Sequence, residues 1–201
     1  MARGFKICNL LLVVSVFILS LASPGAACVG KTLTIGTTGT AQQELLAEIV
    51  SLLITERTGT TVKMAQFETL DALHEAHLKA EVDIAIGYTG QGQLEILKGE
   101  AIQDRTALYS AVKTRFNEEL NLIWLEPFGF EEPTIVPAGI PGEAAPVVRK
   151  DTLKKFPALA RLINKLGGAI DQATIARLQE KTGQSETRDV ARSFLRENRL
   201  I

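Results

Sequence analysis

Cysteine is nearly absent from this 201-residue chain, since Cys8 and Cys28 are its only two and both stand near the beginning. The residues after Cys28 can therefore form no internal disulfide and no thiolate metal cluster. An excess of basic residues is also missing, because 22 Lys and Arg side chains are interspersed with 23 Asp and Glu. Without a basic patch or an arginine-and-aromatic stripe, nucleic acid is not expected as a partner.

Residue patterns for catalysis are missing as well. No Ser, His and Asp arrangement with a nucleophile elbow is present, and the glycine-rich turn at 36–40 lacks the lysine of a P-loop. The only histidines, His74 and His77, lie three apart, and Asp71 shares their helix face. HEAH lacks the four-residue spacing of zinc-binding histidines, so packed or solvated side chains are expected. No enzyme activity, cofactor or metal is predicted.

The first 27 residues are expected to be a secretory signal peptide. Arg3 and Lys6 precede an apolar run over 7–22 that ends in small residues, and the run is shorter than the roughly 20 apolar residues of a spanning helix. Removal leaves 20 basic and 23 acidic side chains, a net charge of about −3. A location outside the cytoplasm, such as the periplasm, is expected. Cys28 at the cleavage point is a candidate for lipidation, and an unpaired cysteine is the alternative.

Short β-branched runs then alternate with amphipathic helices. Strands are predicted at 31–36, 60–65, 82–86, 121–127 and 146–149. Helices are predicted at 41–59, 91–98, 105–120, 157–166, 172–181 and 186–197, with another that carries Leu70, Leu73 and Ala76. Thr40, Asp171 and Ser185 are the expected N-caps, and Gly59 ends the first helix. Alternation of this kind favours a mostly parallel sheet with helices on both faces.

Two loops are expected to face one another at the carboxyl ends of the strands, where such sheets bind ligands. Residues 36–40 offer hydroxyls and backbone N–H groups at a helix N-terminus, which favours a carboxylate or phosphate. In the second loop, 87–92, Tyr88 offers an aromatic face to a cation or an apolar group. Taken alone, the same residues are explained more simply by an ordinary capped turn and a half-buried tyrosine.

The stretch from 126 to 146 holds five of the seven prolines and three glycines, so neither a helix nor a central strand is expected to run through it. Its composition is that of a linker. The strands predicted on either side, 124–127 and 146–149, instead suggest that it closes one domain. We expect residues 31–126 and 146–201 to share one core, with 127–145 as a proline-rich connection.

The order of several short motifs resembles the substrate-binding proteins of glycine betaine, choline and proline betaine ABC transporters. The motifs are LTIG, RTGTTV, LKAEVDIAIGYTGQG, WLEPFGF, AAPVVRKDTLKKFPALARLINKL and VARSFLRENRLI, and together they span 31–201. The resemblance implies a type II periplasmic binding protein fold with two α/β lobes. It also implies that this chain is a single three-layer lobe, because about fourteen residues stand where a second lobe of roughly a hundred is normal.

Position by position, the resemblance implies that ligand contacts come from Thr37, Thr38, Gly39, Tyr88 and Thr89. Phe67 and Phe128 are more distant aromatic candidates. The chain departs from the family pattern where it has 66–69 in place of a glycine pair, Glu131 and Glu132 in place of an asparagine pair, and Ala80 in place of a helix-ending glycine.

Two functional hypotheses follow. In the first, the protein is an exported solute-binding component of an ABC transport system for quaternary amines, working with a membrane permease and binding weakly because one lobe leaves the solute partly in water. In the second, it is an interaction module that pairs with itself, as a homodimer, or with another protein through the face that the missing lobe would cover.

Overall fold

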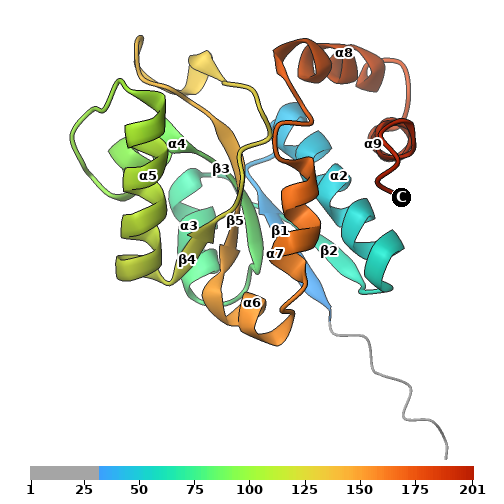
Figure 1. The fold of residues 1–201 in the computed structure, drawn as a ribbon, viewed down its shortest axis with the longest axis horizontal. Helices are drawn as coiled ribbons and strands as arrows, with labels where there is room; N and C mark the ends of the chain where they lie inside the picture. The colour runs from blue at the N-terminus through green and yellow to red at the C-terminus, as the bar shows by residue number, and fades with distance from the viewer. Residues whose placement is uncertain (1–31) are drawn as a thin grey trace, which may run out of the picture. The chain divides into compact units, whose positions relative to one another are not determined.

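The computed structural model describes residues 32–201, so the predicted signal peptide and Cys28 lie outside the described residues. Within this range the chain builds one five-stranded sheet in the order β2-β1-β3-β5-β4 (Figure 1). The strands are β1 (Leu33–Thr37), β2 (Val62–Gln66), β3 (Ile84–Tyr88), β4 (Leu122–Trp124) and β5 (Ala144–Arg149).

Four of the five strands run in the same direction. β1 pairs in parallel with both β2 and β3, whereas β5 is antiparallel to its neighbours β3 and β4. The expected mostly parallel α/β sheet is therefore confirmed. The carboxyl ends of β1 and β3 meet at one edge, which is the position of ligand sites in such sheets.

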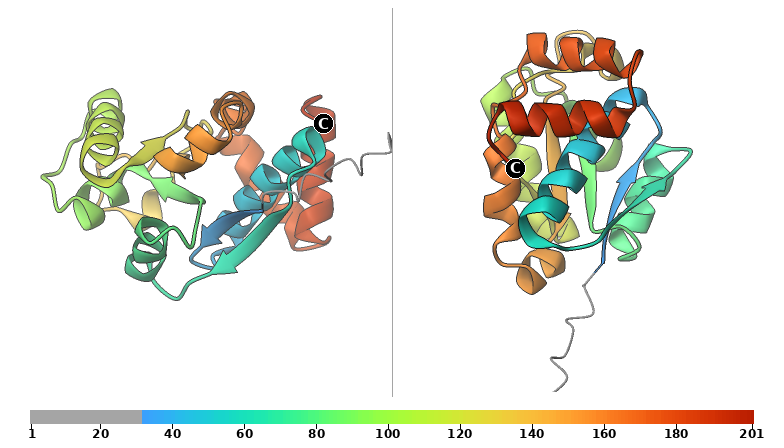
Figure 2. Two further views of the ribbon diagram at one scale, coloured as in Figure 1. Left: turned by 90° about the horizontal axis from the view of Figure 1, so that it is seen from below. Right: turned by 90° about the vertical axis from the view of Figure 1, so that its right-hand side faces the viewer.

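Helices cover both faces of the sheet (Figures 1 and 2). One face packs against α2 (Ala41–Thr58), α7 (Leu159–Ile163), α8 (Gln172–Thr182) and α9 (Thr187–Glu197), and the other against α3 (Leu70–Leu78) and α5 (Arg105–Arg115). The remaining helical segments are α4 (Thr89–Gln91), α6 (Lys150–Lys155), η1 (Gly92–Ile96), η2 (Phe116–Leu120), η3 (Pro133–Ile135) and η4 (Asn164–Leu166). No helix within residues 32–201 combines the length and apolar character needed to cross a membrane.

The two-residue period of the strands divides the core between these layers. In β3, Ile84, Ile86 and Tyr88 point to the side of α2, and Ala85 points to the side of α3. The α2 side holds the larger core, because most apolar side chains of α2 and of the C-terminal helices gather there. This alternation aims Tyr88 at the first turn of α2.

Helix boundaries agree with the local signals in three places. Thr40 and Asp171 cap α2 and α8 through side-chain bonds to backbone N–H groups, and Gly59 ends α2 at φ +68°. Ser185 was a wrong prediction, because Glu186 is the N-cap of α9 and makes no side-chain capping bond. The predicted loop at 87–92 is also wrong, since β3 runs to Tyr88 and α4 begins at once.

The connection, residues 127–145, is packed rather than free. Its two arms pair with each other through Phe128 N–H to the Ala144 carbonyl (2.9 Å) and Glu132 N–H to the Gly142 carbonyl (2.9 Å). Phe128 and Phe130 are buried in the core on the α2 side. Only the tip, 133–141, extends beyond this ladder.

The strand expected at 146–149 is confirmed as β5, which begins two residues earlier, at Ala144, and lies between β3 and β4 with Pro146 inside it. The carbonyl of Pro146 accepts a bond from Leu125 N–H at 2.9 Å on the β4 side, just beyond the end of β4. In an antiparallel strand the N–H and carbonyl of one residue point to the same side. The missing N–H of Pro146 therefore removes no bond to β3.

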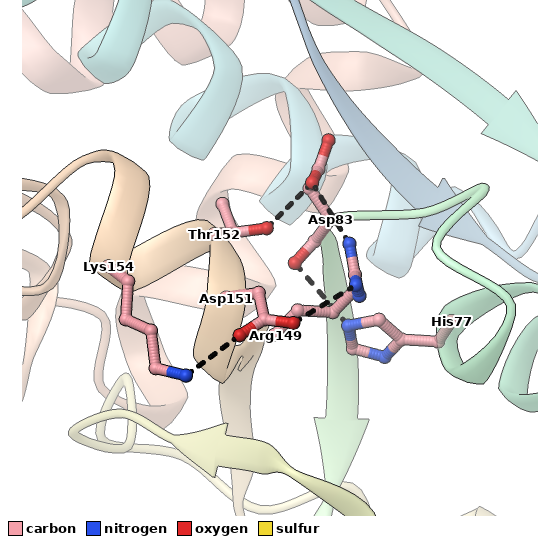
Figure 3. A network of polar contacts seen from close by, with 6 residues as sticks. All are labelled: His77, Asp83, Arg149, Asp151, Thr152 and Lys154. Carbon is pink, nitrogen blue, oxygen red and sulfur yellow. Dashed lines mark hydrogen bonds and ion pairs between the residues drawn. The ribbon is translucent and has the colours of Figure 1, made fainter.

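A polar network joins segments from before and after the connection at the opposite edge of the sheet (Figure 3). The carboxylate of Asp83 accepts bonds from the Thr152 hydroxyl (2.7 Å) and from Thr34 N–H (3.0 Å), and Arg149 Nη1 lies 3.8 Å from it. The His77 ring lies 3.4 Å from the Asp83 carbonyl. Asp83 thereby fixes α3, β1 and the start of α6 relative to β3.

Candidate functional site

A cavity of about 360 Å³, here called the crevice, opens at the carboxyl ends of β1 and β3. Three parts of the chain form its walls. Thr38 and Gln42 come from the turn into α2, Tyr88 and Gln91 from the end of β3 and α4, and Glu132, with Thr134 and Ile135, from the connection; Glu68 and Thr69 also border it. The two strand ends therefore face one another, as the sequence predicted, and the connection supplies the wall opposite them.

The turn into α2 is fixed by Gln43. Its side-chain oxygen accepts from Thr38 N–H at 2.7 Å and from the Thr38 hydroxyl at 2.8 Å, and its own N–H donates to Thr40 Oγ1 at 3.2 Å. These bonds hold the backbone in the non-helical conformation that opens the helix. The Thr38 hydroxyl proton is consequently donated to Gln43, and Thr38 borders the crevice.

A chain of hydrogen bonds crosses the crevice from sheet to connection. The Tyr88 hydroxyl donates to Gln42 Oε1 at 2.7 Å, and Gln42 Nε2 donates to Glu132 Oε2 at 2.9 Å. Burial, assisted by the Glu132 charge, raises the pKa of Tyr88 above its ordinary value. Tyr88 thus remains a neutral hydrogen-bond donor. Because its bond fixes the Gln42 amide, the direction in which Gln42 donates to Glu132 is fixed as well.

Glu132 is the charged side chain that the connection places in the crevice. Its burial alone would raise the pKa, but bonds from the Thr134 hydroxyl (2.6 Å), Thr134 N–H (3.1 Å) and Gln42 outweigh it and lower the pKa. Hydrogen bonds to a carboxylate favour its ionised form. The crevice therefore carries a fixed negative charge at neutral pH.

Of the five positions nominated from the sequence, Thr38 and Tyr88 line the crevice and three do not. Thr37 is buried at the end of β1 and borders a different cavity, of about 450 Å³, beside β2 and α9. Gly39 has φ +77°, and the Gln66 side chain lies directly over its α-carbon. Thr89 is only 1% exposed, and its hydroxyl bonds to the Pro141 carbonyl and Glu143 N–H.

The other aromatic and histidine candidates lie outside the crevice. Phe128 is fully buried in the core, and Phe67 packs beside α3. His77 is buried, and burial lowers its pKa to about 3, while the His74 ring packs 6.4 Å from that of Phe116. Among residues 32–201, no group of three or more His, Cys, Asp or Glu side chains could hold a metal ion.

Three crevice residues were missed by the sequence reasoning. Gln42 and Glu132 are 90 residues apart, so no local pattern connects them. Gln91 was placed in the predicted loop 87–92 and at the start of a predicted helix but was not nominated as a contact, and it lines the crevice. Glu132 had a signal, since Glu131 and Glu132 stand where the resembled family carries an asparagine pair after EPFGF. That departure lies where the connection enters the site.

Sequence comparison identifies relatives over most of the chain. The model of a family described as the substrate binding domain of ABC-type glycine betaine transport systems matches residues 31–137 and 133–197. The carnitine transport binding protein OpuCC of Listeria monocytogenes is 30% identical over 176 residues, which cover 84% of this chain and 54% of that protein. The chain therefore spans about half the length of this curated relative.

Solved structures share the fold at low sequence identity. The crystal structure of a glycine betaine/carnitine/choline ABC transporter superposes with a TM-score of 0.77 at 14% identity, covering 84% of this chain and 99% of that one. Apo YehZ from Escherichia coli gives a TM-score of 0.73 at 16% identity, covering 86% and 100% of the two chains. The α/β architecture of residues 32–201 is thus shared with these two structures.

Proposed function

Because this chain belongs to the family of substrate-binding domains of ABC-type glycine betaine transport systems, we propose that it is a one-lobe solute-binding component for quaternary amines. The solute binds in the crevice, between the strand ends of β1 and β3 on one side and the connection on the other. Export by the predicted signal peptide and delivery of the solute to a membrane permease complete the proposal. It assigns the protein a binding role and no catalysis.

The observation that carries this proposal is the crevice itself. Its volume of about 360 Å³ suits a small organic solute, since pockets of roughly 300–1,000 Å³ hold such ligands. Tyr88 and Glu132 both border this space. Aromatic and anionic groups are the two kinds of partner that attract a trimethylammonium group.

Within this proposal the five nominated residues divide into two roles. Thr38 and Tyr88 contact the solute. Thr37, Gly39 and Thr89 shape the site indirectly: Thr37 ends β1, Gly39 permits the tight turn at φ +77°, and Thr89 fastens the base of the connection through Pro141 and Glu143.

Affinity is expected to be weak. Only 3% of Tyr88 is exposed, so most of its ring area belongs to the core, and no second aromatic ring borders the crevice within the described residues. A single lobe also leaves part of the solute in water and cannot close over it by a hinge. A Kd between about 10 µM and 1 mM, or roughly −7 to −4 kcal/mol, is consistent with these contacts.

The alternative is an interaction module that forms a homodimer or pairs with another protein. It depends on the face of this chain that the missing lobe would cover. Glu132, Thr134 and Ile135 of the connection instead border the crevice together with the strand ends, which suits a small solute. We therefore favour the solute-binding function.

Calorimetric titration of residues 28–201 with choline, glycine betaine and carnitine tests the proposal. Saturable binding of at least one solute is expected, and Gln91→Ala, which removes a lining side chain, should weaken it. Gln184→Ala, an exposed glutamine on the turn between α8 and α9, is the matched control and should leave binding unchanged. The proposal fails if none of the three solutes gives saturable heat at millimolar concentration.

A further inference from the structure

The crevice contains negative charge and no compensating positive side chain. Glu68 and Glu132 border it, and no Lys, Arg or His does so among the described residues. Arg105, which pairs with Glu131 of the connection and lies 3.9 Å from Glu143, does not border the crevice. A solute in the crevice therefore meets two carboxylates, and no basic side chain lining the crevice offsets their charge.

The N-terminus of α2 does not reverse this balance. A helix N-terminus acts as about half a positive charge, and its influence fades within the first turn. Against it stand two full carboxylates, one of which accepts from Gln42 in that same first turn. The position where an anionic group would meet α2 is thus shared with a carboxylate of the protein itself.

Glu132 is held there by more than one contact. Its Oε2 accepts from Gln42 Nε2, and its Oε1 accepts both from the hydroxyl and from the N–H of Thr134. A side chain fixed from two sides cannot swing away from an approaching anion without losing these bonds. It is also supplied by the connection, the segment that stands in place of a second lobe.

We propose that Glu132 makes the crevice select organic cations that carry no carboxylate, such as choline, over zwitterions such as glycine betaine and carnitine. The inference rests on the proposed function and specifies its solute class. Discrimination arises from repulsion of the wrong solute as well as from attraction of the right one.

Calorimetry with tetramethylammonium, choline and glycine betaine at pH 7.5 and low salt tests the inference. Choline is expected to bind at least about tenfold more tightly than glycine betaine, because two like charges in a partly enclosed site repel strongly. Tetramethylammonium should bind as well, since it presents the cationic group alone. Glu132→Gln, which preserves shape and acceptor oxygen, should reduce the preference to less than about threefold.

Glu131→Gln is the matched control, because Glu131 is the neighbouring acid of the connection and faces Arg105 outside the crevice. It should leave the preference unchanged. Salt dependence of the unmodified protein gives a second readout that needs no variant: choline affinity should fall as ionic strength rises.

Glycine betaine binding as tightly as choline, or an unchanged preference in Glu132→Gln, would overturn the selectivity while leaving the proposed function standing. Choline affinity that does not respond to salt would also count against it. Failure of all three solutes to bind would overturn both.

Discussion

Gln42 lies between Tyr88 and Glu132, accepting a hydrogen bond from the first at 2.7 Å and donating one to the second at 2.9 Å. Through this one side chain, the end of β3 orients the connection. The relationship joins the residue that the sequence nominated, Tyr88, to the residue that it did not, Glu132. It also supplies the first stability test.

Replacing Gln42 with leucine should lower the free energy of unfolding by about 1–3 kcal/mol, because the buried Tyr88 hydroxyl then has no acceptor. Tyr88→Phe removes the same hydrogen bond from the other side. The double variant should be less destabilised than the sum of the two single variants, by about 1 kcal/mol. Urea unfolding measures all four proteins, and strictly additive losses would mean that the two side chains do not interact.

A second prediction concerns backbone strain at Ala80, which has φ +69° just after α3. The left-handed conformation costs a non-glycine residue roughly 1–2 kcal/mol, and glycine gives back about 0.4–1 kcal/mol through the unfolded chain. Ala80→Gly should therefore stabilise the protein by about 0.5–1 kcal/mol. Ala176→Gly, at an exposed position inside α8, should instead destabilise it by about 1 kcal/mol. A destabilised Ala80→Gly protein would contradict this account.

Acid sensitivity should come in part from His77. Burial is the main cause that lowers its pKa to about 3, and the charges of His74 and Arg149 act in the same direction against the bond to the Asp83 carbonyl. Below pH 6.5 the unfolded state binds a proton at His77 that the folded state does not bind. The free energy of unfolding therefore falls as the pH drops from about 6.5 toward 3.

Between pH 7 and pH 5 this group should remove about 2 kcal/mol of stability. His77→Gln has no such proton to take up, so its loss over the same interval should be smaller by that amount. Urea midpoints at the two pH values measure the difference. Equal losses in both proteins would show that His77 is accessible to protons in the folded state.

We propose that the segments before and after the connection unfold together, since Asp83 and Thr152 bond across them and Leu33 and Phe194 lie in one core. Thr152→Val, which removes a buried donor, should destabilise the protein by about 1–2 kcal/mol, and Thr152→Ser should retain the bond. Fluorescence of Trp124, the only tryptophan, and circular dichroism should report one common transition in each protein. Two separated transitions would indicate independent parts.

The sequence predicted those features that depend on neighbouring residues. Thr40, Asp171 and Gly59 act within one helical turn, and the alternating runs around them define the strands. The errors arose where distant partners decide. β5 begins at Ala144, two residues before the predicted start, because Ala144 pairs with Tyr88 of β3, and nothing in the local composition indicates this partner.

The candidate site divides in the same way. Thr38 and Tyr88 follow strands and could be nominated from position alone. Thr89 looked equivalent but faces the connection, whose path the composition of 126–146 did not reveal. Gln42 and Glu132 meet only when the connection folds back over α2, which is a property of the packed structure rather than of either segment.

The central claim is that one lobe and its connection hold the solute between them. Amide chemical shifts of the ¹⁵N-labelled protein, recorded during titration with choline, test it most directly. The account predicts saturable shifts that centre on Thr38, Gln42, Tyr88, Gln91 and Glu132, with β2 and α9 unaffected. Shifts that spread over the whole surface without saturating, or that gather instead at the cavity of about 450 Å³ beside β2 and α9, would contradict it.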